Sequence, residues 1–97
     1  LEGTHLVLIE NDKVIGMVVA PDSNMNPNIT EISYLAVKER EKGKGTKLIS
    51  ELKKICKEKK KRSIITYSRS AVDFYKKQGF KKITEDSKGS YLFLRLE

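Results

Sequence analysis

Hydrophobic and polar residues alternate along the first third of the chain in a way that predicts strands. Leu, Val and Ile are concentrated in residues 5–9 and 13–20, on either side of Asn11-Asp12, which is typical of two strands joined by a tight turn. Residues 21–28 contain two Pro and three Asn and predict a loop, and residues 30–37 predict a third strand. We therefore expect a hairpin followed by one more strand.

The hydrophobic period changes to that of a helix in the middle of the chain. Leu48, Leu52 and Ile55 follow one another at i, i+4 and i+7, so they share one face of an amphipathic helix. The opposite face is mostly Lys and Glu, which suits contact with water. This pattern predicts a helix from residue 46 to about residue 60.

Short hydrophobic segments separated by polar turns fill the C-terminal third. Residues 64–67 predict a short buried strand. Ser70 and Asp73 are spaced as a capping box and predict the start of a short helix, which Gly79 ends at its C′ position. The last two predicted strands are residues 80–84 and 91–96, and residues 86–89 form the turn between them.

The predicted order is β-β-β-α-β-α-β-β, which defines an α+β (mixed α/β) fold. Its third strand, first helix and fourth strand can form a right-handed parallel β-α-β unit inside a mixed, mainly antiparallel sheet. The chain has 97 residues and no internal repeat, so we expect one small domain over residues 1–97. The same length excludes a large multi-layered enzyme.

The charge balance adds an anionic partner to this picture. The chain has 20 Lys and Arg against 13 Asp and Glu, a formal net charge of +7. Such a balance favours nucleic acid, an acidic surface or a phosphate-rich cofactor as the partner, and charge alone does not choose among them.

The cysteine, histidine and apolar content limits other chemistry. The single Cys56 forms no internal disulfide and no long apolar run is present, so we expect a soluble protein of a reducing compartment, the nucleus or cytoplasm, without membrane contact. His5 and Cys56 alone do not make a set of metal ligands, so no metal site is expected. Both are typical of packing residues.

A basic turn that contains glycine lies between the third predicted strand and the first predicted helix. Its sequence is Arg40-Glu41-Lys42-Gly43-Lys44-Gly45-Thr46. Backbone N–H groups at a helix start and the helix dipole together form an anion site, and the glycines permit close approach of a pyrophosphate. The alternative is a solvated glycine turn, and the spacing alone supports both equally, because short glycine motifs match often by chance.

Two motifs in fixed order resemble the signature of the GNAT superfamily of acetyl-CoA-dependent N-acetyltransferases. The first is Arg40-x-x-Gly43-x-Gly45 after a strand, and the second is Ala71-x-x-Phe74-Tyr75-x-x-x-Gly79-Phe80. Residues 31–37 and 65–80 are most similar to the Gcn-type histone acetyltransferase branch. The resemblance covers nearly the whole chain, from the second strand of the family to its last, and lacks the first strand and two leading helices.

The resemblance implies that acetyl-CoA is the cosubstrate, and it implies where acetyl-CoA binds. In the family, the pantetheine arm lies between two diverging strands, and the pyrophosphate rests on backbone amides at the start of the following helix. Basic side chains of the turn would add positive charge there. The implied cofactor-binding residues are Leu35, Ala36, Val37, Arg40, Lys42, Gly43, Lys44, Gly45, Thr46, Ser68, Ala71, Phe74 and Tyr75.

Three residues are implied to carry the chemistry. The backbone N–H of Leu35 matches the position that polarises the thioester carbonyl in the family. Glu31 stands where the Gcn-type enzymes carry their catalytic glutamate, and on a partly buried strand the pKa of its carboxyl would be raised. Tyr75 matches a tyrosine with which many GNAT enzymes protonate the leaving thiolate, and packing is an equally weighted role for it.

A lysine of a histone-like protein is the leading acceptor that the resemblance implies, by direct attack in a ternary complex. Because the leading helices form one wall of the acceptor groove, another chain or segment is expected to complete it. The alternatives are a small amine as acceptor, binding of CoA or a partner without turnover, and a basic nucleic-acid-binding module. The nucleic-acid module would use the basic run at residues 57–62, which is more often a solvated helix end.

Overall fold

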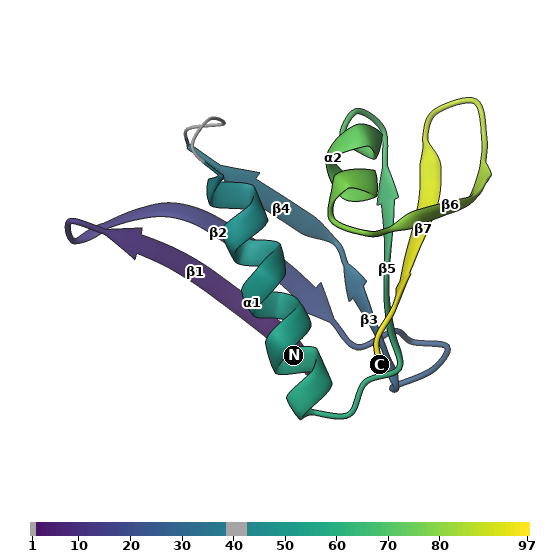
Figure 1. Cartoon of the computed structure of the whole chain (residues 1–97), viewed down its shortest axis with the longest axis horizontal. Helices are drawn as coiled ribbons and strands as arrows, with labels where there is room; N and C mark the ends of the chain where they lie inside the picture. The colour runs from purple at the N-terminus through teal and green to yellow at the C-terminus, as the bar shows by residue number, and fades with distance from the viewer. Residues whose placement is uncertain (1, 39–42) are drawn as a thin grey trace.

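A computed structural model describes residues 2–38 and 43–97 of the chain. It begins with the expected hairpin, in which β1 (Gly3–Glu10) and β2 (Lys13–Pro21) pair antiparallel (Figure 1). Asn11 and Asp12 both have positive φ, at 52° and 63°, in the two-residue turn between them. Such a turn matches the right-handed twist of the strands that it joins.

The predicted third strand is interrupted, which corrects the single strand expected over residues 30–37. It consists of β3 (Ile29–Ile32) and β4 (Tyr34–Val37), with Ser33 between them. The N–H of Ser33 donates to the carbonyl oxygen of Val19 at 2.9 Å, yet the register partner of Val19 is Tyr34. Two residues thus face one residue of β2, which is a β-bulge and bends the strand.

The bulge places the two halves of the interrupted strand in different sheets. β4 belongs to a sheet of order β1-β2-β4, and β3 to a sheet of order β3-β5-β7-β6. The remaining strands are β5 (Ser63–Ser68), β6 (Lys81–Glu85) and β7 (Ser90–Arg95). The pairing of β3 with β5 is parallel and the other pairings are antiparallel, so the expected mixed α+β fold with a central parallel unit is confirmed.

Both helices pack on the same face of these strands (Figure 1). The first, α1 (Lys44–Glu58), begins and ends two residues before its predicted limits. Cys56 on its buried side lies 3.4 Å from the hydroxyl of Thr30 on β3, Sγ to Oγ1. The apolar face of α1 covers the core, in which Leu52 of α1 and Val18 of β2 are fully buried.

The second helix, α2 (Val72–Lys77), does not start with the predicted capping box of Ser70 and Asp73. Its N-cap is Ala71, and no side chain caps it. The N–H of Ala71, the residue directly before the helix, instead donates to the hydroxyl of Ser68 at 2.9 Å. This bond satisfies the donor of the N-cap residue. The predicted end is confirmed, because Gly79 follows the helix with a φ of +100°.

The other face of the strands carries no helix within the described part of the chain. Val7, Ile9 and Tyr34 are each more than half exposed, at 54%, 57% and 54%. In the register, Val7 faces Met17 and Met17 faces Ala36, so these side chains form one apolar surface across β1, β2 and β4. We call this surface the open face.

Two lysines of the basic run at residues 57–62 bind other parts of the protein, Lys59 from an exposed position and Lys61 from a partly buried one. The ammonium of Lys59 donates to the carbonyl oxygen of Gly3 and the hydroxyl of Thr4 on β1. The ammonium of Lys61 lies 3.0 Å from a carboxylate oxygen of Asp22.

No helix in residues 2–38 and 43–97 is long and apolar enough to cross a membrane.

The core position of Leu52 predicts a large loss of stability on truncation. Replacing Leu52 with Ala leaves a cavity under α1 and should lower the free energy of unfolding by about 2–5 kcal/mol. The matched control is Val7→Ala on the open face, where little packing is lost and the effect should be within about 0.5 kcal/mol. Urea denaturation measures both, and equal costs at the two positions would contradict this assignment of the core.

Candidate active site

A cleft of about 600 Å³ lies between β4, the first turn of α1 and the start of α2, on the side where β4 has separated from β5. It exists because β5 pairs with β3 only as far as the register pair of Ile32 and Thr66, while β4 pairs with β2 beyond the bulge. The two strands therefore separate after Ser33, with no ladder between them in the described residues. The cleft is lined by Leu35, Ala36, Val37, Gly43, Gly45, Thr46, Ser70, Ala71, Asp73 and Phe74.

Backbone donors of β4 point into this cleft. The N–H of Lys38 donates to the carbonyl oxygen of Ile15 on β2 at 2.8 Å. In an antiparallel ladder successive residues point their polar groups to alternate sides, so Ala36 also faces β2, while Leu35 and Val37 face away from it. The N–H groups of Leu35 and Val37 are therefore available along the edge where β5 has separated.

The first turn of α1 closes one end of the cleft. Gly43 is the N-cap, with a left-handed φ of 70° that favours glycine, and no side chain among residues 2–38 and 43–97 caps the helix. Its uncapped N–H groups and the positive end of the helix dipole suit an anion. The predicted ligands Arg40 and Lys42 lie outside the described residues.

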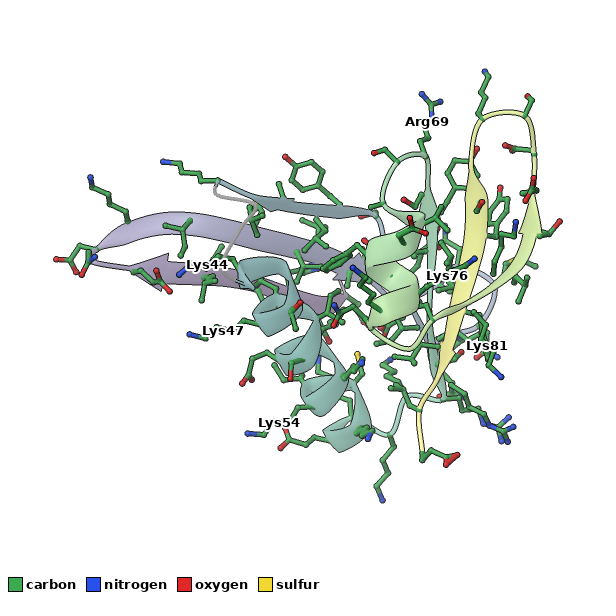
Figure 2. All side chains as sticks on the ribbon, turned by 45° about the horizontal axis from the view of Figure 1, so that its top comes forward. Lys44, Lys47, Lys54, Arg69, Lys76 and Lys81 are labelled. Atoms are coloured by element: carbon green, nitrogen blue, oxygen red, sulfur yellow. The ribbon has the colours of Figure 1, made fainter. Side chains whose placement is uncertain are left out.

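The side chain of Lys44, predicted to add positive charge to this end of the cleft, is directed elsewhere. Its ammonium forms an ion pair with the carboxylate of Glu10 on β1, Nζ to Oε1 at 2.7 Å. Figure 2 shows Lys44, Lys47 and Lys54 along the same side of α1. Much of the Lys44 charge is therefore balanced by Glu10.

The start of α1 is in direct contact with α2. A Cβ added to Gly45 would lie 3.1 Å from the ring of Phe74, so the glycine leaves the space that this ring occupies. The side-chain amide of Gln78 donates to the hydroxyl of Thr46 at 3.0 Å. These contacts join the two helices across the bottom of the cleft, and they explain the predicted association of Gly45 with Phe74 in one site.

Tyr75 is buried behind the cleft wall rather than lining it. Its ring is 5% exposed and lies 5.2 Å, centroid to centroid, from the rings of Phe74 and Phe80. Burial raises the pKa of its phenol, which a hydrogen bond with Thr66 partly opposes. The phenol is thus protonated at neutral pH, near the point where β4 and β5 separate.

Ser68 also lies outside the residues that line the cleft. Its hydroxyl is engaged with the N–H of Ala71, so it organises the β5–α2 loop. Ser70 and Asp73 line the cleft instead, although the sequence suggested only a capping role for them. Their position directly after a strand that borders the cleft was the available signal.

Glu31 is exposed, which corrects the expected partial burial of its carboxylate. The reason is the alternation of β3, in which Thr30 and Ile32 are buried toward α1 and Glu31 points to the opposite side. Its register partner is Ile65 on β5. The structure therefore places Glu31 on the side of the strands that carries the open face, just before the bulge.

The comparison with protein families gives a direct assignment. The profile of the acetyltransferase (GNAT) domain matches residues 1–92. The chain therefore belongs to the GNAT acetyltransferase family, for which acetyl-CoA is the usual cosubstrate. The search of curated proteins found no match.

Solved structures share this fold. An acetyltransferase from Bacillus cereus is 32% identical, with 96% of this chain and 72% of that chain covered and a TM-score of 0.83. For Gcn5 of Tetrahymena the identity is 25%, the coverage 96% and 68%, and the TM-score 0.82. The PaiA N-acetyltransferase of Thermoplasma acidophilum, solved with coenzyme A, is 24% identical, with 94% of this chain and 59% of that chain covered and a TM-score of 0.85.

The contact between Gly45 and Phe74 predicts that Gly45→Val impairs binding of acetyl-CoA. The added side chain would displace the Phe74 ring from the cleft wall and crowd the backbone amides, so we expect affinity to fall at least about tenfold. Ser50→Val, on the exposed side of the same helix, is the control and should bind as the parent does. Isothermal calorimetry measures both; unchanged affinity in folded Gly45→Val would refute this site.

Proposed function

We propose that the chain is an N-acetyltransferase that transfers acetyl from acetyl-CoA to a primary amine, with a protein lysine as the acceptor. The observation that carries the proposal is the cleft between β4 and the starts of α1 and α2. Within the described residues, it has unpaired backbone donors along the β4 edge and a helix start without a side-chain cap at its end. The similarity of residues 31–37 to the Gcn-type branch supports a histone-like lysine.

The residues of the cleft fit acetyl-CoA. The edge donors at Leu35 and Val37 suit the amide groups of a pantetheine arm, which are polar and extended. The first turn of α1, including Gly43 and Thr46, suits the pyrophosphate. The ring of Phe74 offers an apolar wall between these two ends. When bound, acetyl-CoA supplies the acetyl group as a thioester.

The N–H of Leu35 is the group we assign to the thioester carbonyl. It points away from β2 and is held by the β2–β4 ladder, so its direction is fixed before any ligand arrives. Loss of one such preorganised donor costs about 2.7–4 kcal/mol in related acyl-transfer chemistry. The side chain of Leu35 takes no part in that role.

Glu31 is the group we assign to the proton of the acceptor. A lysine amine, with a pKa near 10.4, is neutral in only about one molecule in 2,500 at pH 7, so a base is needed. Glu31 is exposed on the side of the strands that no described helix covers, where an acceptor has access. Leu35 lies four positions further along the chain, at most roughly 13 Å away in an extended strand, so water relays the proton from the amine at the thioester to Glu31.

Tyr75 is the group we assign to the leaving sulfur. Its phenol keeps its proton at neutral pH because burial raises its pKa, and a proton donor needs that state. Thr66, whose side chain influences this pKa, belongs to the last register pair of β3 and β5, next to the separation of the strands. Packing between Phe74 and Phe80 fixes the ring.

A second candidate function is binding of acetyl-CoA without turnover. It is favoured by the apolar open face and by the length of the relatives, of which the chain covers 59–72% in the three structures compared. In that case another chain or segment must cover the open face before an acceptor binds. A nucleic-acid module is less well supported, because Lys59 and Lys61 are engaged within the protein.

The free, buried Cys56 fits a reducing compartment, and we place the reaction in the nucleus or cytoplasm. Two classes of acceptor are then possible in this compartment, a protein lysine and a small amine. The exposed apolar side chains around Tyr34 favour a protein acceptor, which has surface to bury there.

Glu31→Gln tests the proposed chemistry. The exchange keeps shape and removes the base, so the rate at neutral pH should fall about 10²–10⁴-fold while acetyl-CoA affinity stays the same. At high pH, where the amine loses its own proton, the variant should regain much of the deficit.

Its matched control is Glu51→Gln on the exposed side of α1, which should keep the rate of the parent. Rates are followed by the release of free thiol from CoA. Affinity is measured by two separate calorimetric titrations, one with acetyl-CoA and one with duplex DNA. A parent that binds DNA but not acetyl-CoA would reject the acetyltransferase assignment. A parent that binds acetyl-CoA without turnover would favour the second candidate.

Tyr75→Phe separates the acid role from packing. Only a hydroxyl is lost, so acetyl-CoA affinity and thermal stability should remain close to those of the parent, while turnover falls because no proton reaches the sulfur. Steady-state kinetics at neutral pH measure the change. Equal turnover in the variant and the parent would leave Tyr75 with packing alone.

A further inference from the structure

The last two residues of β5 pair with a strand on one side only. Tyr67 and Ser68 extend past the final β3–β5 register pair, so in the described structure they pair only with β7, where their partners are Tyr91 and Ser90. Ser90 is also the first residue of β7 after the hairpin turn. Strand ends of this kind fray unless other contacts hold them.

A set of contacts at the tip of the β6–β7 hairpin holds this strand end. The hydroxyl of Tyr67 donates to Asp86 Oδ1 at 2.7 Å, and the same oxygen accepts the N–H groups of Lys88 and Gly89 at 2.8 and 2.9 Å. The N–H of Asp86 donates to the carbonyl oxygen of Gly89 at 2.9 Å. We call the Tyr67, Asp86 and Gly89 set the clasp.

Gly89 allows the hairpin tip to press directly on the end of β5. A Cβ at this position would lie 2.7 Å from the carbonyl oxygen of Ser68 and 2.8 Å from Cζ of Tyr67. The rings of Tyr67 and Tyr91 pack beside it, with centroids 4.6 Å apart. The clasp thus combines a polar bond, a close backbone approach and an aromatic pair at one strand end.

The charge state of Asp86 is suited to this role. The hydrogen bond from Tyr67 lowers the pKa of the Asp86 carboxyl, and the N–H groups of Lys88 and Gly89 and the nearby Arg69 guanidinium act in the same direction. The carboxylate is therefore charged at neutral pH and accepts all three bonds.

The clasp connects to the cleft through a short chain of contacts. Ser68 follows Tyr67 directly, and its hydroxyl binds the N–H of Ala71. Ser70 and Ala71 line the cleft, and α2 starts immediately after them. Displacement of the end of β5 would therefore move this wall of the cleft.

We propose that the clasp is a positioning element of the active site: by holding the end of β5 it keeps the wall formed by Ser70 and Ala71 in place for the cosubstrate. None of its residues lines the cleft, so they act through the β5–α2 loop. The choice of acetyl-CoA as ligand rests on the proposed function, whereas the effect on the loop does not.

The first measurement uses the full chain without ligand. Tyr67→Phe removes the bond to Asp86 and keeps the aromatic pair, so amide hydrogen exchange at Ala71 should become at least about threefold faster, with exchange in the middle of α1 unchanged. Tyr91→Phe is the matched control, because it alters the other ring of the pair outside the clasp, and it should leave Ala71 unaffected.

The second measurement is acetyl-CoA affinity by calorimetry. Tyr67→Phe and Asp86→Ala should each weaken binding about 3- to 10-fold at a temperature where both remain folded. The double variant should be no weaker than Asp86→Ala alone, because that variant already removes the Tyr67 bond together with those from Lys88 and Gly89. Asp86→Asn retains an oxygen acceptor and should restore most of the affinity.

Two outcomes would overturn the proposal. One is unchanged exchange at Ala71 in Tyr67→Phe, which would show that the loop is held without the clasp. The other is unchanged affinity in Tyr67→Phe when the parent binds acetyl-CoA, which would make the clasp purely structural. If the parent does not bind acetyl-CoA, the proposed function fails, and the exchange at Ala71 still decides whether the clasp holds the loop.

Discussion

The divergence of two strands after one inserted residue determines most of this structure. Ser33 separates β3, which pairs with β5, from β4, which pairs with β2, and its own N–H donates to Val19 of β2, the residue whose register partner is Tyr34. Without a bulge, β4 would continue the direction of β3 beside β5, and their backbone groups would bond to each other. With it, β4 stays with β2, and the N–H groups of Leu35 and Val37 face no partner strand in the described part of the chain. One irregularity thus creates both the space of the cleft and the donors at its edge.

The helices complete the site because both lie on the same face. The start of α1 meets one end of the cleft and α2 supplies its wall, and the contacts of Gly45 with Phe74 and of Thr46 with Gln78 join them. The proposed function assigns the opposite side of the strands, where Glu31 is exposed, to the acceptor. Cosubstrate and acceptor can therefore approach from different sides of the diverging strands.

Periodicity predicted most of the fold, because strands and helices with one buried face leave a regular pattern. It recovered the β1–β2 hairpin and the helix that buries Leu52, and the paired glycine and Phe74-Tyr75 motifs indicated the site. The bulge at Ser33 was not predictable in this way, because residues 34–37 are all apolar or aromatic and no change of alternation marks the inserted residue. The ion pair of Lys44 with Glu10 joins residues far apart in the sequence, so no local pattern could indicate it.

The exposure of Glu31 shows a second limit. Which face of a short strand is buried depends on the helix that packs on it, and Thr30, a polar residue, is the one that meets α1. Ser68 was assigned from the family resemblance and Ser70 from its spacing to Asp73, whereas loop geometry decides which hydroxyl binds the backbone and which residue lines the cleft.

The contact between Gly45 and Phe74 has a consequence for sequence change in this domain. Because a methyl group at position 45 would already lie 3.1 Å from the ring, the two positions share one volume and are not free to vary separately. A larger residue in the first turn of α1 requires a smaller or shifted one on α2. The glycine motif and the aromatic motif, although distant along the chain, should therefore change together during divergence.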